Sequence, residues 1–173
     1  MALTLLRHAA LLPKHQKRYN GWTDLSIDPS SFHFDAIQIL QQQTFDSIYS
    51  SDLLRCQETL FMMGIEQFQT DERLREIRFH THIEGLSFDE ISKLPSFKPE
   101  YLEDATLWQN YICKESNKAF EARILSFLDA LPQGQEILIC SHGGTLQKIL
   151  ALLGYNKTNI QNLEWIRIEN GVC

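Results

Sequence analysis

The sequence lacks the features of a membrane or secreted protein. No apolar run approaches the roughly 20 residues that a bilayer-spanning helix needs, and we expect neither a signal peptide nor a membrane partner. The cysteines Cys56, Cys113, Cys140 and Cys173 are far apart and form no C-x-x-C pair. The thiols are therefore expected to be reduced, with Cys140 in the core, which favours a cytoplasmic location.

An excess of positive charge is also missing. With 16 Lys and Arg residues against 22 Asp and Glu residues, the formal net charge is −6. This argues against a nucleic-acid partner, because phosphate backbones need a basic face. A small anionic substrate stays compatible with the sequence, since a few arginines can form a local positive pocket. The length of 173 residues and the apolar share of 43% suit one globular domain over residues 1–173.

Strand-like and helix-like segments alternate along the chain. The pattern predicts helices over about 28–43, opened by Asp28 and Pro29, and over 52–63, capped by Ser50, Ser51 and Asp52. Two further helices are predicted over 117–131 and 145–153, and strands over 2–6, 45–49, 136–140 and 163–168. This order predicts an α/β fold, a three-layer α/β/α sandwich whose sheet is mostly parallel.

Residues 78–115 break this alternation. They are rich in aromatic, acidic and proline residues and show little periodicity. We interpret them as a lid over the carboxyl ends of the strands rather than as a second domain. Tyr101, Trp108 and Tyr111 are expected to pack beneath the lid, and contact between one of them and substrate is the alternative.

Basic and imidazole side chains stand where the strands end. Arg7 and His8 follow the first strand, Arg55 lies in the first turn of a helix, and His142 follows the strand at 136–140. If these strands are neighbours in a parallel sheet, the side chains converge on one pocket. Arginines hold phosphate by paired hydrogen bonds, and a neutral imidazole can attack phosphorus. Gly143 and Gly144 are expected to leave the backbone N–H groups after His142 open to an oxygen ligand.

Hydrolysis of a phosphoester also needs a proton for the leaving oxygen. Glu76 is the preferred general acid, because Leu74 and Ile77 flank it and can hold it in a partly apolar wall. Glu72 and Glu84 are nearby alternatives.

Five segments occur in an order that is typical of one family. They are Leu6-Arg7-His8-Ala9, the stretch from Tyr19 to Ile27, the stretch from Ser51 to Thr59, the stretch from Leu74 to Phe79, and His142-Gly143-Gly144. With them the chain resembles the histidine phosphatases, the superfamily that includes cofactor-dependent phosphoglycerate mutase. Glu115 and Arg123 resemble a worn copy of a further family segment.

The resemblance implies a phosphoglycerate mutase-like fold and a phosphohistidine mechanism. It implies no metal and no organic cofactor, and His80 and His82 lack the carboxylate or cysteine partners that would complete a metal site. The implied nucleophile is His8 and the implied proton donor is Glu76. Phosphate binding is implied for Arg7, Asn20, Gly21, Arg55 and His142.

Three departures leave two alternatives beside a phosphatase. Ala9 replaces the family's glycine, Leu11 stands where Thr or Ser is frequent, and Lys14 stands where an Asn often helps to hold phosphate. A degenerate member that binds phosphorylated ligands without turnover is one alternative, and a phosphoglycerate mutase is the other. The segments most resemble the α-ribazole-phosphate phosphatase branch, which acts in cobalamin assembly. We expect a small phosphorylated metabolite as substrate and a monomer or homodimer.

Overall fold

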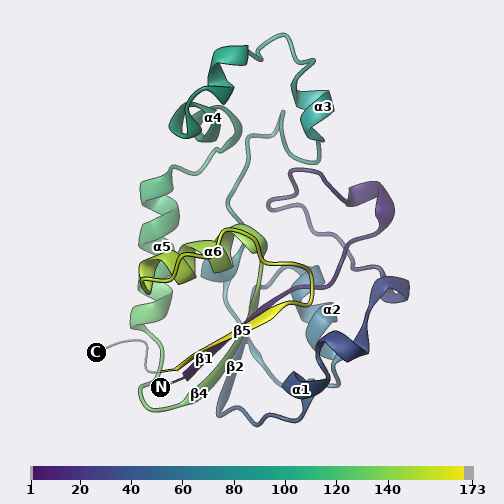
Figure 1. Ribbon diagram of the computed structural model, residues 1–173, viewed down its shortest axis with the longest axis vertical. Coiled ribbons are helices and arrows are strands. Elements are labelled where there is room, and N and C mark those ends of the chain that lie inside the picture. The colour runs from purple at the N-terminus through teal and green to yellow at the C-terminus, as the bar shows by residue number, and fades with distance from the viewer. Residues whose placement is uncertain (1, 170–173) are drawn as a thin grey trace.

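A five-stranded sheet forms the centre of the fold in the computed structural model, which describes residues 2–169 (Figure 1). The strand order is β3-β2-β4-β1-β5, with β2, β3, β4 and β1 parallel and β5 antiparallel to β1. The strands are β1 Ala2–Arg7, β2 Ser47–Ser50, β3 Gln69–Thr70, β4 Glu136–Ser141 and β5 Trp165–Glu169.

Helices cover both faces of the sheet, as the sequence predicted. The α-helices are α1 Gln38–Gln41, α2 Leu54–Met62, α3 Phe88–Ile91, α4 Ala105–Ile112, α5 Asn117–Asp129 and α6 Gly143–Leu152. The 3-10 helices are η1 Pro13–His15, η2 Pro29–Ser31, η3 Phe34–Ala36, η4 Glu72–Leu74 and η5 Pro99–Leu102. In Figure 1, α5 and α6 lie on one side of the strands, and α1 and α2 lie on the other.

Alternate residues of β4 enter two separate cores. Ile137 and Ile139 pack in the cluster that holds the apolar faces of α5 and α6. Leu138 and Cys140 pack in the cluster that holds α1 and α2. All four side chains have no solvent exposure, because a parallel sheet with helices on both faces is buried on both sides. The prediction of a three-layer α/β/α sandwich with a mostly parallel sheet is confirmed.

The helix predicted over 28–43 is wrong as a single element. Asp28 does cap the segment, since its Oδ1 accepts a hydrogen bond from the Ser30 amide at 3.0 Å. The chain then forms η2, η3 and the short α1 instead of one helix. The buried apolar residues Phe32, Ile37 and Leu40 are spaced by five and then three positions. The backbone is extended at Phe32 and His33, which interrupts the helical turns, so these three side chains reach the core from separate short turns.

Residues 78–115 extend beyond the carboxyl ends of the strands, at the top of Figure 1. They carry α3, η5 and α4. Tyr101 stacks on Tyr111 with ring centroids 4.6 Å apart, and Trp108 lies 5.9 Å from Tyr111. These rings pack with one another inside the segment, as expected, and Trp108 also reaches Tyr19 at 6.1 Å.

Two features of the described residues bear on the expected location. Cys56, Cys113 and Cys140 are buried free thiols, and Cys173 lies outside the described residues. Between residues 2 and 169, no helix has both the length and the apolar composition that crossing a bilayer demands.

The central strand should dominate stability. Ile139→Ala removes a side chain with no solvent exposure and is expected to lower the free energy of unfolding by about 2–5 kcal/mol in urea titrations. The matched control is Ile39→Ala, where the side chain is 65% exposed and the expected change is within about 0.5 kcal/mol. Similar losses in both variants would contradict this assignment of the core.

Candidate active site

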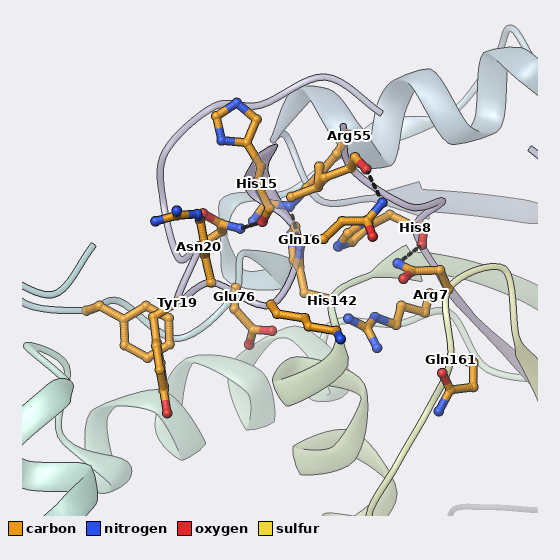
Figure 2. Close-up of a pocket in the computed structure, with 15 residues that line it drawn as sticks. Arg7, His8, His15, Gln16, Tyr19, Asn20, Arg55, Glu76, His142 and Gln161 are labelled. Atoms are coloured by element: carbon orange, nitrogen blue, oxygen red, sulfur yellow. Dashed lines mark hydrogen bonds between the residues drawn. The ribbon is translucent and has the colours of Figure 1, made fainter. Parts of the chain in front are cut away.

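The strand order brings the predicted basic residues together. Arg7 ends β1, His142 directly follows β4, and Arg55 lies in the first turn of α2, which follows β2. Because β1, β4 and β2 are adjacent and parallel, their carboxyl ends share one edge of the sheet. The rings of His8 and His142 meet edge to face with centroids 5.2 Å apart, and Figure 2 shows Arg7, His8, Arg55, Glu76 and His142 around one cavity.

His8 is held as a neutral imidazole with a defined tautomer. Its Nδ1 lies 2.7 Å from the carbonyl oxygen of Ala9, and a carbonyl only accepts, so Nδ1 carries the proton. The lone pair is therefore on Nε2. Burial, reinforced by the charges of Arg55 and Arg7, lowers the pKa of His8 well below its usual value. The side chain of Asn162 fixes the local backbone by donating to the His8 carbonyl oxygen at 2.8 Å.

His142 adopts the opposite tautomer. Its Nδ1 accepts a hydrogen bond from Arg55 Nε at 3.1 Å, so the proton lies on Nε2 and is donated to Ser51 Oγ at 2.8 Å. Burial lowers its pKa well below the usual value, and the positive charge of Arg55 acts in the same direction. Two neutral imidazoles thus stand side by side with complementary hydrogen-bonding roles.

Two buried guanidinium groups supply the positive charge of the cavity. Arg55 is 1% exposed and donates to the carbonyl oxygens of Thr23 at 2.9 Å and Gly21 at 2.7 Å. Arg7 donates from Nη1 to the Ile160 carbonyl at 2.5 Å, whereas its buried Nε has no hydrogen-bond partner among the described residues. Burial lowers the pKa of both groups. A buried donor without a partner favours an anionic ligand.

Glu76 is fixed by backbone amides. Its Oε2 accepts from the Gly144 amide and its Oε1 from the Ile77 amide, both at 2.9 Å. A Cβ atom at position 144 would lie 2.5 Å from Glu76 Oε1, so a larger residue there would displace the carboxylate. The turn at Gly143 and Gly144 was expected to leave its amides open to a ligand. That expectation is wrong for Gly144, whose amide donates to the Glu76 carboxylate. Gly143 instead lets the Arg7 guanidinium approach closely.

The three candidate acids are separated by their positions. Glu76 lines the cavity, and neither Glu72 nor Glu84 is among the residues that line it. Glu84 Oε1 instead accepts from the amides of Gly21 at 2.8 Å and Thr23 at 3.0 Å, and so holds the neighbouring loop. The position of Glu76 is the one that suits a general acid.

Asn20 and Gly21 lie next to each other in the loop that Glu84 holds, but only Asn20 lines the cavity. Asn20 lines the cavity, with its Nδ2 donating to the His15 carbonyl at 2.6 Å. Gly21 is buried behind the cavity wall, where its amide binds Glu84 and its carbonyl binds Arg55. A Cβ atom at Gly21 would lie 2.8 Å from the Ile77 carbonyl oxygen. The expected contact of Gly21 with phosphate is therefore replaced by a structural role.

The structure accommodates Ala9 and Lys14, which differ from the residues usual in the family. Ala9 is buried, and its amide donates to Thr59 Oγ1 at 2.9 Å. Among the described residues only Lys17 and Leu163 combine a side chain with a positive φ, so alanine fits at position 9 without backbone strain. Lys14 does not line the cavity, whereas Lys17 does, with a φ of 55°. A cation is thus available at this loop from Lys17.

The cavity has a volume of about 520 Å³ and is predominantly basic. Its cations are Arg7, Lys17, Arg18 and Arg55, and Glu76 is the one carboxylate among its described lining residues. Sequence reasoning missed lining residues that come from irregular loops and carry no periodic pattern: Gln16, Lys17, Gln161 and Asn162. The charge balance favours an anionic ligand.

The segment that carries Glu76 is clamped from behind. Arg123 donates to the carbonyl oxygens of Arg73, Arg75 and Glu76 at 2.6, 2.9 and 3.0 Å. Glu115 holds Arg123 in place through a contact of 2.7 Å. The Trp22 indole also donates to the Glu76 carbonyl at 2.8 Å. The pair noted in the sequence thus positions the backbone of the acid.

No metal centre is built near these groups. Over residues 2–169, no three His, Cys, Asp or Glu side chains are placed to hold a metal ion. His80 and His82 stack on each other with ring centroids 5.4 Å apart.

Comparison with known proteins supplies the family. The model of the family described as "Histidine phosphatase superfamily (branch 1)" matches residues 3–171 of this chain. This chain belongs to the histidine phosphatase superfamily. The resemblance inferred from its motifs is confirmed, and so is the expectation of an enzyme of the histidine phosphatase type.

Relatives within the family carry both phosphatase and mutase names. The chain is 33% identical to "Putative phosphoserine phosphatase 2" of Hydrogenobacter thermophilus, over 97% of this chain and 85% of the relative. It is 27% identical to a 2,3-bisphosphoglycerate-dependent phosphoglycerate mutase of Pseudoalteromonas atlantica, over 86% of this chain and 82% of the relative. The crystal structure of the α-ribazole phosphatase from Shigella flexneri shares the fold, with a TM-score of 0.78 and 23% identity over 98% and 90% of the two chains.

Burial of two neutral histidines makes stability depend on pH. Their folded-state pKa values lie well below the usual 6.5, so below that pH the unfolded chain binds more protons than the folded chain. The stabilisation is complete above the unfolded-state pKa and is lost as the pH falls below it. Each histidine is expected to contribute a slope of up to about 1.4 kcal/mol per pH unit, measured by urea unfolding across this range.

His8→Asn and His142→Asn should each lower the slope of unfolding free energy against pH by up to about 1.4 kcal/mol per pH unit, which corresponds to one proton. The control is His33→Asn, which removes an exposed histidine remote from the cavity lining. An unchanged slope in both active-site variants would show that the imidazoles are not buried as neutral groups.

Proposed function

We propose that this enzyme hydrolyses small phosphomonoesters through a phosphohistidine formed on His8. The observation that carries the proposal is the state of His8, a neutral imidazole whose proton sits on Nδ1 and whose Nε2 lone pair is free. The buried charges of Arg7 and Arg55 favour a phosphoryl group beside that nitrogen. Residue chemistry alone therefore supplies both a nucleophile and charge stabilisation.

The reaction proceeds in two displacements at phosphorus. In the first, His8 Nε2 forms the N–P bond, the P–O bond to the alcohol breaks, and the leaving oxygen takes a proton from Glu76. In the second, water attacks phosphorus, Glu76 takes a proton from the water, and the N–P bond breaks. Inorganic phosphate leaves, and His8 returns to its starting state.

The other site residues stabilise the phosphoryl oxygens. Arg7 offers its unpartnered Nε, and His142 offers its Nε2 proton, with the phosphoryl oxygen replacing Ser51 as the acceptor. Asn20 and Lys17, which line the same cavity, add polar and charged contacts from the loop. Equatorial oxygens surrounded in this way carry the transition-state charge without reorganisation of solvent.

A phosphoglycerate mutase is the second candidate, supported by the relative of that name at 27% identity. We favour hydrolysis because the relative with the higher identity, 33%, carries a phosphatase name. The degenerate alternative loses its support at Ala9, which fits without strain. Isomerisation of 3-phosphoglycerate without phosphate release would favour the mutase.

The proposal extends to the substrate and the setting. The fold shared with an α-ribazole phosphatase makes α-ribazole 5′-phosphate a candidate substrate, with a role in cobalamin assembly. A cytoplasmic monomer or homodimer that needs no metal, cofactor, nucleic acid or membrane is proposed with it.

Phosphate release in excess EDTA tests the reaction. The wild-type enzyme should hydrolyse a panel that includes p-nitrophenyl phosphate, 3-phosphoglycerate and α-ribazole phosphate. His8→Ala should lower turnover by about 10³-fold or more, because the nucleophile is lost. Vanadate should still bind to the variant, since both arginines remain. Full activity in His8→Ala would exclude the phosphohistidine.

The role of Glu76 is tested through the leaving group. Glu76→Gln should slow alkyl phosphates by about 10²- to 10⁴-fold, because their alcohols need a proton. Turnover of p-nitrophenyl phosphate, whose leaving group needs little proton transfer, should fall by much less. Thermal unfolding of the variant controls for lost contacts to the Gly144 and Ile77 amides. Equal losses on both ester types would remove Glu76 from the acid role.

A further inference from the structure

A second cleft adjoins the phosphate cavity. It has a volume of about 590 Å³ and lies where α4 approaches α5 and α6. Tyr19 and Phe79 line both spaces, so they form a shared wall. The other side of the cleft is formed by Trp108 of α4, and Ile112 and Phe120 contribute further apolar surface.

Glu76 stands at the boundary between the two spaces. Its carboxylate lines the phosphate cavity, whereas the two residues whose amides hold it, Ile77 and Gly144, line the second cleft. In Figure 2, Glu76 lies between Tyr19 on one side and Arg7 and His8 on the other. The leaving oxygen of a bound ester must sit at Glu76 while its phosphorus faces His8. An alcohol portion that continues past Glu76 in the direction of Ile77 and Gly144 reaches the second cleft.

Aromatic and aliphatic side chains form much of the wall of this cleft, and Lys148 is the one charged residue among its described lining residues. Tyr19 meets Phe79 edge to face with ring centroids 5.4 Å apart, and it meets Trp108 at 6.1 Å. Burial, together with the nearby carboxylates of Glu76 and Glu115, raises the pKa of the Cys113 thiol to about 12, so it stays neutral. A flat apolar ring can pack against such walls edge to face or with an offset.

An acidic alcohol portion would bind less favourably in the second cleft. The cation at the rim, Lys148, already contacts Asn117 Oδ1 at 2.9 Å and Glu121 Oε2 at 3.5 Å. A second carboxylate or phosphate would lose hydration against the aromatic walls, and it would have to compete with Glu121 for Lys148, the one cation among the described lining residues. The cleft thus discriminates against small acidic esters.

We propose that the second cleft binds the alcohol portion of the substrate and that this portion carries an aromatic or heteroaromatic ring. The inference rests on the proposed function, because it takes His8 and Glu76 as the reacting groups. Tyr19, Phe79 and Trp108 are then the residues that determine specificity.

Matched esters isolate this effect. Propyl phosphate and 3-phenylpropyl phosphate have leaving alcohols of similar acidity, so the chemical step is the same and the ring is the difference. The aryl ester is expected to have a kcat/KM roughly 10- to 100-fold higher, as burial of one aromatic side chain would give. Equal values, with both esters hydrolysed, would overturn the inference and leave the proposed function intact.

Neighbouring positions on α4 provide a matched pair of variants. Ala105 is exposed at the rim of the cleft, and Thr106 is exposed but does not line it. Ala105→Phe should fill the cleft and lower the ratio of aryl to propyl kcat/KM toward one. Thr106→Phe should leave that ratio and the basal turnover unchanged. Retention of the full ratio in Ala105→Phe would mean that the ring binds elsewhere.

Binding of the corresponding phosphonates separates the inference from the reaction. 3-Phenylpropylphosphonate should bind more tightly than propylphosphonate by roughly 10- to 100-fold in calorimetry, and Ala105→Phe should remove the difference. Equal affinities would overturn the proposed cleft whether or not the esters turn over. Tighter aryl binding without release of phosphate from either ester would support the cleft and overturn the proposed hydrolysis.

Discussion

The parallel pairing of β1 with β4 is the constraint on which the site depends. In this register Arg7 lies opposite Ser141, so the next residues, His8 and His142, leave the sheet at the same level. A shift of one residue would turn alternate side chains of β4 to the opposite face. The two buried cores oppose such a shift, since Ile137 and Ile139 belong to one and Leu138 and Cys140 to the other. Packing of the interior thus sets the distance between the two imidazoles.

Burial gives these residues their chemical character. Arg55 bridges the site, because it donates to His142 and to two loop carbonyls, and its charge adds to the effect of burial in lowering the pKa of His8. The same charges that favour a phosphoryl anion also favour an unprotonated nucleophile. In the proposed reaction, ligand binding and activation of His8 are therefore two results of one electrostatic arrangement, and neither needs a separate base to remove a proton from the imidazole.

The parts of the site that lie on regular structure could be predicted from the sequence. Arg7, His8, Arg55 and His142 follow apolar strands or open a helix, and the strand pattern is enough to expect their convergence. The separation of Glu76 from Glu72 and Glu84 required the structure, because none of the three lies on a strand or an α-helix. Lys17 and Asn162 were missed for the same reason, since loop contacts with strands distant in sequence leave no periodic pattern.

In the fold, too, the regular elements could be predicted from the sequence and the irregular segments could not. The strands at 2–6 and 136–140 and the helix at 117–131 were predicted nearly as found, because their apolar periodicity is strong. The segment 28–43 was not, since tertiary burial of Phe32, Ile37 and Leu40 overrode its helical appearance. β3 has two residues, both exposed, and so carries no strand pattern at all.

Gly21 and Thr23 are both held through their main-chain groups. Glu84 accepts from the amides of Gly21 and Thr23, and Arg55 donates to the carbonyls of the same two residues. These hydrogen bonds do not involve the side chain at position 23. That side chain can therefore change without the loss of the hydrogen bonds that hold Arg55. Position 21 has no such freedom, because any β-carbon there meets the Ile77 carbonyl. Two positions in one short loop thus face very different limits on their evolution.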